Sequence, residues 1–125
     1  MHKIFYLAAP YSGTEAEIEK RMEQLCVTDA ILMKNNFFTF SPLMKHFIID
    51  YEKLPGDWEY WQRYSQALLA KSDGMIVLKL DGWEKSTGVQ AEIEICKNQN
   101  IPVIFFSFED IVKGKFLVAL EEFVK

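Results

Sequence analysis

One carboxylate in this sequence is predicted to face the core from a helix. The segment from Ser86 to about Asn98 has a helical pattern, and at about 100° per residue its apolar residues gather on the side of Glu92. These residues are Gly88, Val89, Ala91, Ile93, Ile95 and Cys96. Glu94 lies on the opposite, polar side. A core-facing carboxylate is unfavourable unless it is paired, hydrogen-bonded or protonated, and such placements are more common at functional sites than elsewhere. Glu92 is therefore the first candidate functional residue, although it could instead cap a backbone segment or pair with Arg63.

The start of the same helix carries groups that favour an anion. Ser86-Thr87-Gly88 brings hydroxyls and free backbone N–H groups to a helix N-terminus, where anions bind. Thr87, with Gln90 three residues later, is predicted to be the N-cap, which does not exclude a ligand role for Ser86. The anion site and Glu92 would lie about a turn and a half apart, so that one small ligand could contact both.

These residues need a scaffold, and the hydrophobic pattern predicts strands that alternate with helices. The predicted strands are Lys3 to Ala9, Phe37 to Phe40, Met75 to Leu80 and Pro102 to Phe106. The predicted helices are Thr14 to about Asn35, Asp57 to about Lys71, Ser86 to about Asn98 and Phe116 to Val124. Such alternation implies a parallel sheet with helices on both faces. We expect an α/β protein, a three-layer α/β/α sandwich with a small parallel, flavodoxin-like or Rossmann-like sheet.

In sheets of this kind the ligand lies beyond the carboxyl ends of the strands. The loops expected there are Pro10 to Gly13, Ser41 to Gly56 and Asp81 to Ser86. The second is predicted to be a long loop with two prolines, and long loops in small domains are often functional. The segment from Ser107 to Lys115 has no clear pattern. The candidate functional residues all fall in or just after these three loops.

Composition limits the classes of function. The 125 residues are half apolar and 26% charged, which is typical of one globular domain spanning residues 1–125. A net charge of −4 argues against binding of polymeric nucleic acid. The chain has no secretory signal and no apolar run long enough for a membrane span, so a cytoplasmic protein is expected. Cys26 and Cys96 are expected to be buried, reduced thiols. Neither a metal-ligand spacing nor a Gly-x-Gly-x-x-Gly motif is present, so we expect no metal and no cofactor.

Two stretches carry a resemblance to a known superfamily. Ile4-Phe5-Tyr6-Leu7-Ala8-Ala9-Pro10-Tyr11-Ser12, together with the stretch from Leu80 to Glu92, resembles the nucleoside 2-deoxyribosyltransferase superfamily. The chain is most similar to a small bacterial and phage branch with the pattern Trp-Glu-x-Ser-x-Gly-x-x-x-Glu. The resemblance extends from Lys3 to about Phe106 and implies one nucleoside 2-deoxyribosyltransferase-like domain.

The resemblance implies a retaining mechanism with two catalytic residues. The superfamily's nucleophilic glutamate falls on Glu92, which would attack the anomeric carbon and form a glycosyl-enzyme intermediate. Its tyrosine at the end of the first strand falls on Tyr6, whose hydroxyl would orient that carboxylate. Tyr6 could otherwise be a plain strand residue that packs against a helix. A 2-deoxyribosyl group suits this chemistry, because loss of the 2'-hydroxyl eases the oxocarbenium-like transition state.

The resemblance also implies where a substrate would bind. Transferases acting on free nucleosides typically have an aspartate six residues before the nucleophile, whereas deoxynucleoside monophosphate hydrolases have a serine suited to a 5'-phosphate. Ser86 occupies this position and favours a nucleotide. The further predicted substrate contacts are Gly88, Ser12, Gly13, Trp83, His46 and Asp81.

Several of these contacts have structural alternatives. Ser12 and Gly13 would contact the phosphate, or form a simple turn. Trp83, and less strongly Trp58 and Trp61, would stack on a base, or belong to the core or an interface. His46 would contact the base or leaving group, or be an ordinary surface histidine.

The sequence departs from the superfamily pattern in two places. The position of a second catalytic acid falls on Ser65, which cannot act as an acid at neutral pH, and Asp57 and Glu59 lie earlier on the same helix. The first loop lacks the arginine of some phosphate-binding members, and Arg21, Lys45 or a neighbouring subunit would have to supply the charge.

The expected function is an N-glycosidase that hydrolyses 2'-deoxynucleoside 5'-monophosphates through a covalent intermediate on Glu92. Base exchange by a nucleoside 2-deoxyribosyltransferase is the alternative within the enzyme class. A non-catalytic nucleotide-binding module is the alternative outside it, and a structural or assembly protein that keeps only the fold is a third possibility. The expected partner is a small nucleotide or nucleoside, with no membrane involved. The resemblance also implies a homodimer or larger homo-oligomer.

Overall fold

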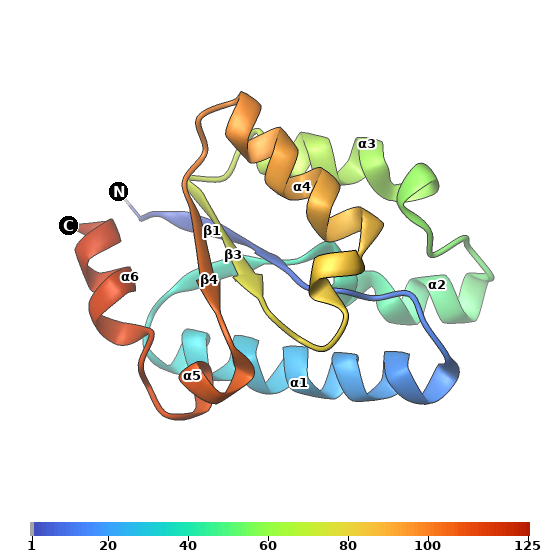
Figure 1. Ribbon diagram of the computed structural model, residues 1–125, viewed down its shortest axis with the longest axis horizontal. Helices are drawn as coiled ribbons and strands as arrows, with labels where there is room; N and C mark the ends of the chain where they lie inside the picture. Colours follow the sequence, from blue (N-terminus) through green and yellow to red (C-terminus); the bar gives the residue numbers. More distant parts are fainter. Residues whose placement is uncertain (1) are drawn as a thin grey trace.

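The computed structural model of the protein describes residues 2–125 and contains a parallel sheet (Figure 1). Its strands are β1 (Ile4–Ala8), β2 (Phe38–Phe40), β3 (Gly74–Leu78) and β4 (Val103–Phe106), and their order is β2-β1-β3-β4. Tyr6 on β1 lies beside Phe40 on β2 and beside Met75 on β3. From β1 the chain adds β2 on one side of the sheet and then β3 and β4 on the other side. The strand order therefore reverses between β1 and β3, as in flavodoxin-like sheets.

Helices cover both faces of the sheet (Figure 1). One face packs against α1 (Glu15–Lys34), α5 (Phe108–Val112) and α6 (Leu117–Val124). The other face packs against α3 (Trp58–Leu69) and α4 (Thr87–Asn98). The prediction of a three-layer α/β/α fold with a parallel sheet is therefore confirmed.

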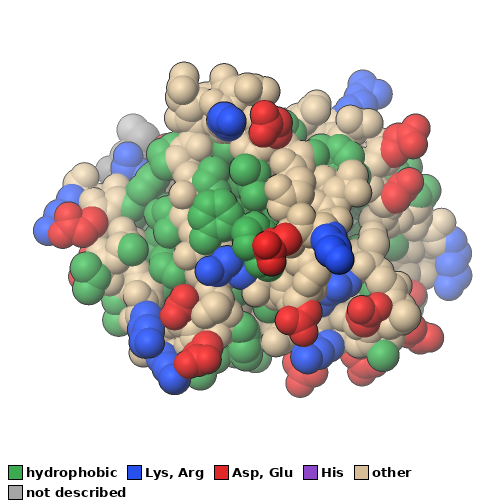
Figure 2. All heavy atoms as spheres, viewed as in Figure 1, with side chains coloured by type: hydrophobic (Ala, Val, Ile, Leu, Met, Phe, Trp, Pro, Cys, Tyr) green, Lys and Arg blue, Asp and Glu red, His purple; other side chains and the backbone are tan. Residues whose placement is uncertain are grey.

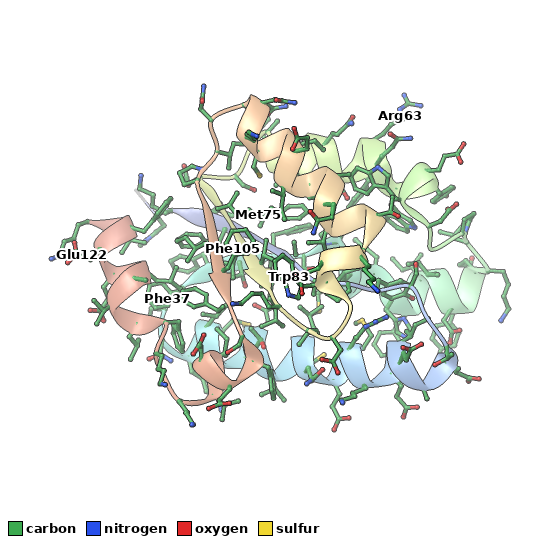
Figure 3. All side chains as sticks on the ribbon, viewed as in Figure 1. Phe37, Arg63, Met75, Trp83, Phe105 and Glu122 are labelled. Carbon is green, nitrogen blue, oxygen red and sulfur yellow. The ribbon has the colours of Figure 1, made fainter. Side chains whose placement is uncertain are left out.

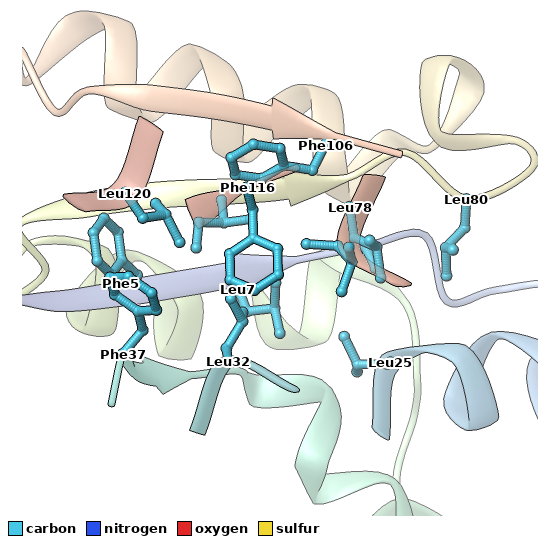
Figure 4. Close-up of a cluster of buried hydrophobic side chains, with 13 residues drawn as sticks. Phe5, Leu7, Leu25, Leu32, Phe37, Leu78, Leu80, Phe106, Phe116 and Leu120 are labelled. Atoms are coloured by element: carbon cyan, nitrogen blue, oxygen red, sulfur yellow. The ribbon is translucent and has the colours of Figure 1, made fainter. Parts of the chain in front are cut away.

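The two layers of core follow from the alternation of side chains along β1. Phe5 and Leu7 point into the apolar cluster beneath α1 and α6, where they are completely buried (Figure 4). Tyr6 and Ala8 point to the opposite face and pack in the layer below α3 and α4. Because a strand covered on both faces needs apolar residues at every position, β1 reads as a continuous apolar run. Tyr6 is therefore a buried hydroxyl inside an otherwise apolar layer.

Local capping determines where α1 and α5 begin. The Thr14 hydroxyl accepts from the Glu17 backbone N–H at 3.2 Å, and the Glu17 carboxylate accepts from the Thr14 N–H at 2.8 Å, which is the capping box expected from the sequence. Ser107 and Asp110 form the same arrangement at the start of α5. The segment that had no clear pattern thus contains a short capped helix.

The segment from Ser41 to Gly56 contains helices, and the prediction of a long loop was wrong. A 3-10 helix (Pro42–Lys45) leads directly into α2 (His46–Glu52). The Ser41 hydroxyl accepts from the Leu43 N–H at 3.3 Å, and Pro42 occupies the first helical position, where its missing N–H costs no bond. The two prolines therefore lie outside α2 and do not interrupt it.

The predicted burial of the cysteines was half right. Cys96 is buried with its sulfur near Met75, whereas Cys26 is exposed, and both are free thiols. The buried side of α1 passes through Leu25, Thr28 and Leu32. Thr28 can occupy this stripe because its hydroxyl donates to the Gln24 carbonyl at 2.9 Å. Cys26 therefore points away from the sheet.

Candidate active site

A cavity of about 620 Å³ lies beyond the carboxyl ends of β1 and β3, at the point where the strand order reverses. Ligands of doubly wound α/β proteins bind at such points. We call it the main cavity. Its polar and charged lining residues include Ser12, Arg21, Asp57, Glu59, Ser65, Lys85, Ser86, Thr87 and Glu92. Its apolar and aromatic lining residues include Leu7, Pro42, Leu43, Ile49, Trp58, Trp61 and Val89.

Glu92 is a buried carboxylate of this cavity, with 7% of its surface exposed. The helical period of α4 turns it inward, because Val89 and Cys96, three residues before and four after it, are both buried against the sheet. The Tyr6 hydroxyl donates a hydrogen bond to Glu92 Oε2. The predicted inward placement of Glu92 is confirmed, and Tyr6 is the partner of its carboxylate.

Burial makes Glu92 a group that titrates near neutrality. The loss of hydration raises the pKa of Glu92 from 4.5 to about 7, and the hydrogen bond from Tyr6 opposes this rise without cancelling it. Burial and the neighbouring carboxylate raise the pKa of Tyr6 far above its ordinary value, so that the phenol keeps its proton and remains a donor. The pair therefore holds a carboxylate whose charge changes within the physiological range.

The second carboxylate oxygen of Glu92 remains open to the cavity. Among residues 2–125, no buried side-chain oxygen or nitrogen lacks a hydrogen-bond partner. No hydrogen bond within the described chain reaches Glu92 Oε1, so this atom must keep some contact with solvent in the main cavity. Oε2 is thus the oriented oxygen and Oε1 the one that a ligand can reach.

Ser86 is the N-cap of α4, and the prediction of Thr87 was wrong. Ser86 has extended backbone angles (φ −73°, ψ 118°), and its Oγ accepts from the Val89 N–H at 3.2 Å. Thr87 is already inside the helix, so its hydroxyl is not the cap. A hydroxyl that accepts one bond still carries a proton to donate. Ser86, which lines the main cavity, can therefore cap the helix and donate to an anion at the same time.

Arg21 supplies a positive charge that the first loop lacks. Its guanidinium donates to the Ser12 carbonyl at 2.6 Å and to the Asp81 carbonyl at 2.9 Å, and it lines the main cavity. These bonds join the loop after β1 to the loop after β3. Within residues 2–125, Arg21 lies in no ion pair. Its charge lies at the cavity, with Glu17 close enough to interact with it, whereas Lys45 is not among the residues that line this cavity.

Two glycines leave room for the Arg21 guanidinium. An added Cβ at Gly13 would lie 2.8 Å from one of its nitrogens, and one at Gly82 would lie 3.0 Å from the other. Gly82 also has a φ of 88°, which side chains rarely adopt. Gly13 thus serves the site by making space for Arg21.

The remaining predicted contacts divide between two cavities. Ser12 and Gly88 line the main cavity. Gly13 and His46 line a neighbouring cavity of about 900 Å³, which we call the second cavity. His46 Nδ1 lies 2.7 Å from the Tyr11 hydroxyl, so that these two side chains are partners. Asp81 is exposed and takes part through its backbone carbonyl, which accepts from Arg21.

The tryptophans that line the main cavity are Trp58 and Trp61, not Trp83. Trp83 packs beside Phe105 of β4 with ring centroids 5.7 Å apart (Figure 3). Phe105 is 41% exposed, on a face where Figure 2 shows hydrophobic side chains gathered in front of the sheet. Trp61 is held by a hydrogen bond from its Nε1 to the Pro55 carbonyl at 2.6 Å. The aromatic wall of the cavity therefore consists of these two tryptophans at the start of α3, and Tyr11 adds a further ring from the loop after β1.

The position of the second acid, Ser65, is also part of the main cavity. Ser65 is 3% exposed, and its hydroxyl interacts with the Tyr6 side chain. Asp57 and Glu59, earlier on the same segment, line the cavity as well. Arg63 makes no ion pair within the described part of the chain, and Figure 3 shows it pointing away from the body of the protein. The alternative pairing of Glu92 with Arg63 is thus not observed.

Four residues of the lining were not predicted from the sequence. Pro42, Leu43 and Ile49 line the main cavity, although their segment was expected to be a loop, and Lys85 adds a second cation. The apolar residues of that segment were the available signal.

No helix in residues 2–125 is both long and apolar enough to cross a membrane, and no group of three or more metal-binding side chains occurs there. The homo-oligomer and the cytoplasmic location stay predictions.

Comparison with known proteins gives a family without an assigned activity. A family model described as "Domain of unknown function (DUF1937)" matches residues 3–108. A search of curated proteins found no match. The description of the family names no chemistry, so the resemblance to the nucleoside 2-deoxyribosyltransferase superfamily stays a prediction. Since the match covers most of the 125 residues, the chain belongs to this family of domains of unknown function.

Proposed function

We propose that the protein is an N-glycosidase that hydrolyses the bond between base and sugar in 2'-deoxynucleoside 5'-monophosphates. The observation that carries the proposal is the buried carboxylate of Glu92, which is paired with the Tyr6 hydroxyl instead of a cation and borders a cavity large enough for a nucleotide. A carboxylate in this environment is costly to the fold, and such groups are common where chemistry requires them.

The proposed reaction has two displacements at the anomeric carbon. Glu92 Oε1 attacks C1' of the sugar, the C1'–N bond breaks, and its electron pair leaves with the base. The leaving base takes a proton from water, since the Ser65 hydroxyl is too weak an acid at neutral pH. Water then attacks C1', the bond from C1' to Glu92 breaks, and the proton of the water goes to solvent. The products are the free base and 2-deoxyribose 5-phosphate.

The cationic side of the main cavity suits the 5'-phosphate. Arg21 and Lys85 both line it, and Arg21 is free of ion pairs within residues 2–125. Ser86 adds a hydroxyl at the N-terminus of α4, where the helix dipole favours an anion. Phosphate binding by these groups would hold the sugar with its C1' near Glu92.

A non-catalytic nucleotide-binding module is the second candidate. Ser65 favours it, because this residue occupies the position of the second acid and lies in the same cavity as Glu92. Such a protein would bind a nucleotide without releasing a base. Base exchange is the alternative within the enzyme class, since a second base could replace water in the second displacement.

Incubation with deoxynucleoside and ribonucleoside monophosphates and with free nucleosides tests the proposal. Released base is measured chromatographically for the wild type and for Glu92→Ala. We expect release from deoxynucleotides by the wild type alone. Saturable binding with no released base would instead support the binding module. Transfer of a labelled free base into nucleotide would support base exchange.

Tyr6→Phe is expected to lower kcat by about tenfold to a hundredfold and to move the pH profile. The Tyr6 hydroxyl favours the ionised form of Glu92, so its removal raises the pKa of Glu92 further. Because the nucleophile must be ionised, activity should rise with pH through this pKa, and the rise should occur at higher pH in the variant. The pH dependence of kcat/KM measures the shift, with the exposed Tyr60→Phe as control. An unchanged profile would argue against the orienting role of Tyr6.

A further inference from the structure

We propose that Asp57 makes the main cavity selective for adenine and cytosine, which carry an amino group where hypoxanthine and uracil carry a carbonyl oxygen. This inference rests on the proposed function and narrows its substrate class. It concerns the end of the cavity formed by α3, where Asp57 lies next to the aromatic wall of Trp58 and Trp61.

Asp57 is not used by the helix that it precedes. It is the N-cap of α3, with the extended backbone angles of that position (φ −87°, ψ 162°). An aspartate there ordinarily accepts a hydrogen bond from the first turn of the helix. Within the described chain, the Asp57 side chain makes no such bond, yet it lines the main cavity. Asp57 also lines the second cavity, so it lies at the border of the two, and its carboxylate is available to a ligand there.

The backbone around Asp57 is held on both sides. The Trp61 indole donates to the Pro55 carbonyl at 2.6 Å, and the Trp61 backbone N–H donates to the Asp57 carbonyl at 3.2 Å. One residue thus fixes both the segment before Asp57 and the first turn after it. The backbone of Asp57 therefore has a defined position, and its exposed side chain, which makes no bond to the helix, can turn toward a ligand.

The charged residues of the main cavity come from different elements. Arg21 and Lys85 come from α1 and from the segment before α4, whereas Asp57 and Glu59 come from the start of α3. The ion pairs in residues 2–125 involve none of these four groups. A phosphate is attracted to the cations and repelled by the carboxylates. A bound nucleotide would therefore direct its base toward α3, where the tryptophans can stack on it.

The chemistry of a carboxylate then selects among bases. An ionised carboxylate only accepts hydrogen bonds, and the amino groups of adenine and cytosine donate them. Uracil, thymine and hypoxanthine carry a carbonyl oxygen at the equivalent position, which a carboxylate repels. A site built around such a hydrogen bond discriminates strongly against the analogue that cannot make it.

Matched substrates that differ at this one group provide the test. The pairs are deoxycytidine against deoxyuridine 5'-monophosphate and deoxyadenosine against deoxyinosine 5'-monophosphate. For the wild type, kcat/KM should be at least about tenfold higher for the amino member of each pair. In Asp57→Asn, which has no charge and an amide that can donate to a carbonyl, the preference should fall to about threefold or less. Glu94→Gln, an exposed site outside the cavity, should keep the wild-type preference.

The outcomes separate this inference from the proposed function. If base is released without a preference, the role of Asp57 is overturned, but the proposed N-glycosidase activity is supported. The same holds if the preference remains in Asp57→Asn and the melting temperature of the variant is unchanged. If no base is released, the preference is tested by equilibrium binding of the same four nucleotides to the wild type and to Asp57→Asn. Tighter binding of the amino members that depends on Asp57 supports this inference while the proposed hydrolysis fails. Absence of binding overturns both.

Discussion

Replacement of Glu92 by glutamine is expected to stabilise the folded protein above neutral pH while it abolishes base release. The pKa of Glu92 rises from 4.5 to about 7 because the folded state buries it. Between these two values the folded protein binds a proton that the unfolded chain has already lost, so the stability of the wild type falls as pH rises through this window. This shift in pKa corresponds to a contribution of roughly 3 kcal/mol to the free energy of unfolding. The contribution is present in full below the pKa of the unfolded chain and is lost above about pH 7.

Glutamine removes this cost because it carries no charge at any pH. It is close to glutamate in size, and its amide oxygen can still accept from the Tyr6 hydroxyl. Unfolding by denaturant at about pH 5 and about pH 8 gives the free energies of both proteins. The difference in favour of Glu92→Gln should grow with pH. Glu94→Gln, on the exposed side of the same helix, should differ from the wild type by no more than about 0.5 kcal/mol at both values. A constant difference between wild type and Glu92→Gln would contradict the burial of a titrating carboxylate.

The same variant should lose the reaction. Without a nucleophile no glycosyl intermediate forms, and kcat should fall by at least about a thousandfold. A protein that gains stability and loses activity by one substitution would identify Glu92 as a residue kept for chemistry. Residual base release within about tenfold of the wild type would show instead that Glu92 is not the nucleophile.

Ser86→Asp is expected to reverse the preference for a phosphate. Aspartate caps a helix about as well as serine, so α4 should still begin at the same residue. Its carboxylate would, however, repel the 5'-phosphate of the proposed substrate, which Arg21 and Lys85 would attract. We expect kcat/KM for deoxynucleoside monophosphates to fall by about a hundredfold, while kcat/KM for the free deoxynucleosides stays unchanged or rises. The ratio of the two values is the measurement.

Ser86→Asn is the matched control for this change. Asparagine also caps the helix, but it adds no charge. If repulsion is the cause, Asn should keep most of the preference for the nucleotide. An equal loss in both variants would show that the serine hydroxyl itself, or its size, determines binding. Equal activity of Ser86→Asp on nucleotides and nucleosides, at wild-type levels, would place the phosphate elsewhere.

The sequence by itself determined the features that depend on residues close together in the chain. The alternation of strands and helices predicted the parallel α/β fold, because burial on both faces requires continuous apolar strands. The period of α4 predicted that Glu92 faces inward, since neighbours at three and four residues share one side of a helix. The capping box at Thr14 was likewise a matter of four adjacent residues. Each of these signals is local, and tertiary contacts reinforce it.

Only the tertiary structure decided how distant residues meet at the cavity. Tyr6 and Glu92 are 86 positions apart, and the resemblance alone suggested their contact. Arg21 reaches the cavity from α1 because Gly13 and Gly82 leave space for its guanidinium. Trp58 and Trp61 line the cavity in place of Trp83, because α3 packs against α4 beside the cavity, whereas Trp83 packs against Phe105 of β4. Residue type and period predict which side chains are buried, but packing between segments determines which of two similar side chains reaches a given site.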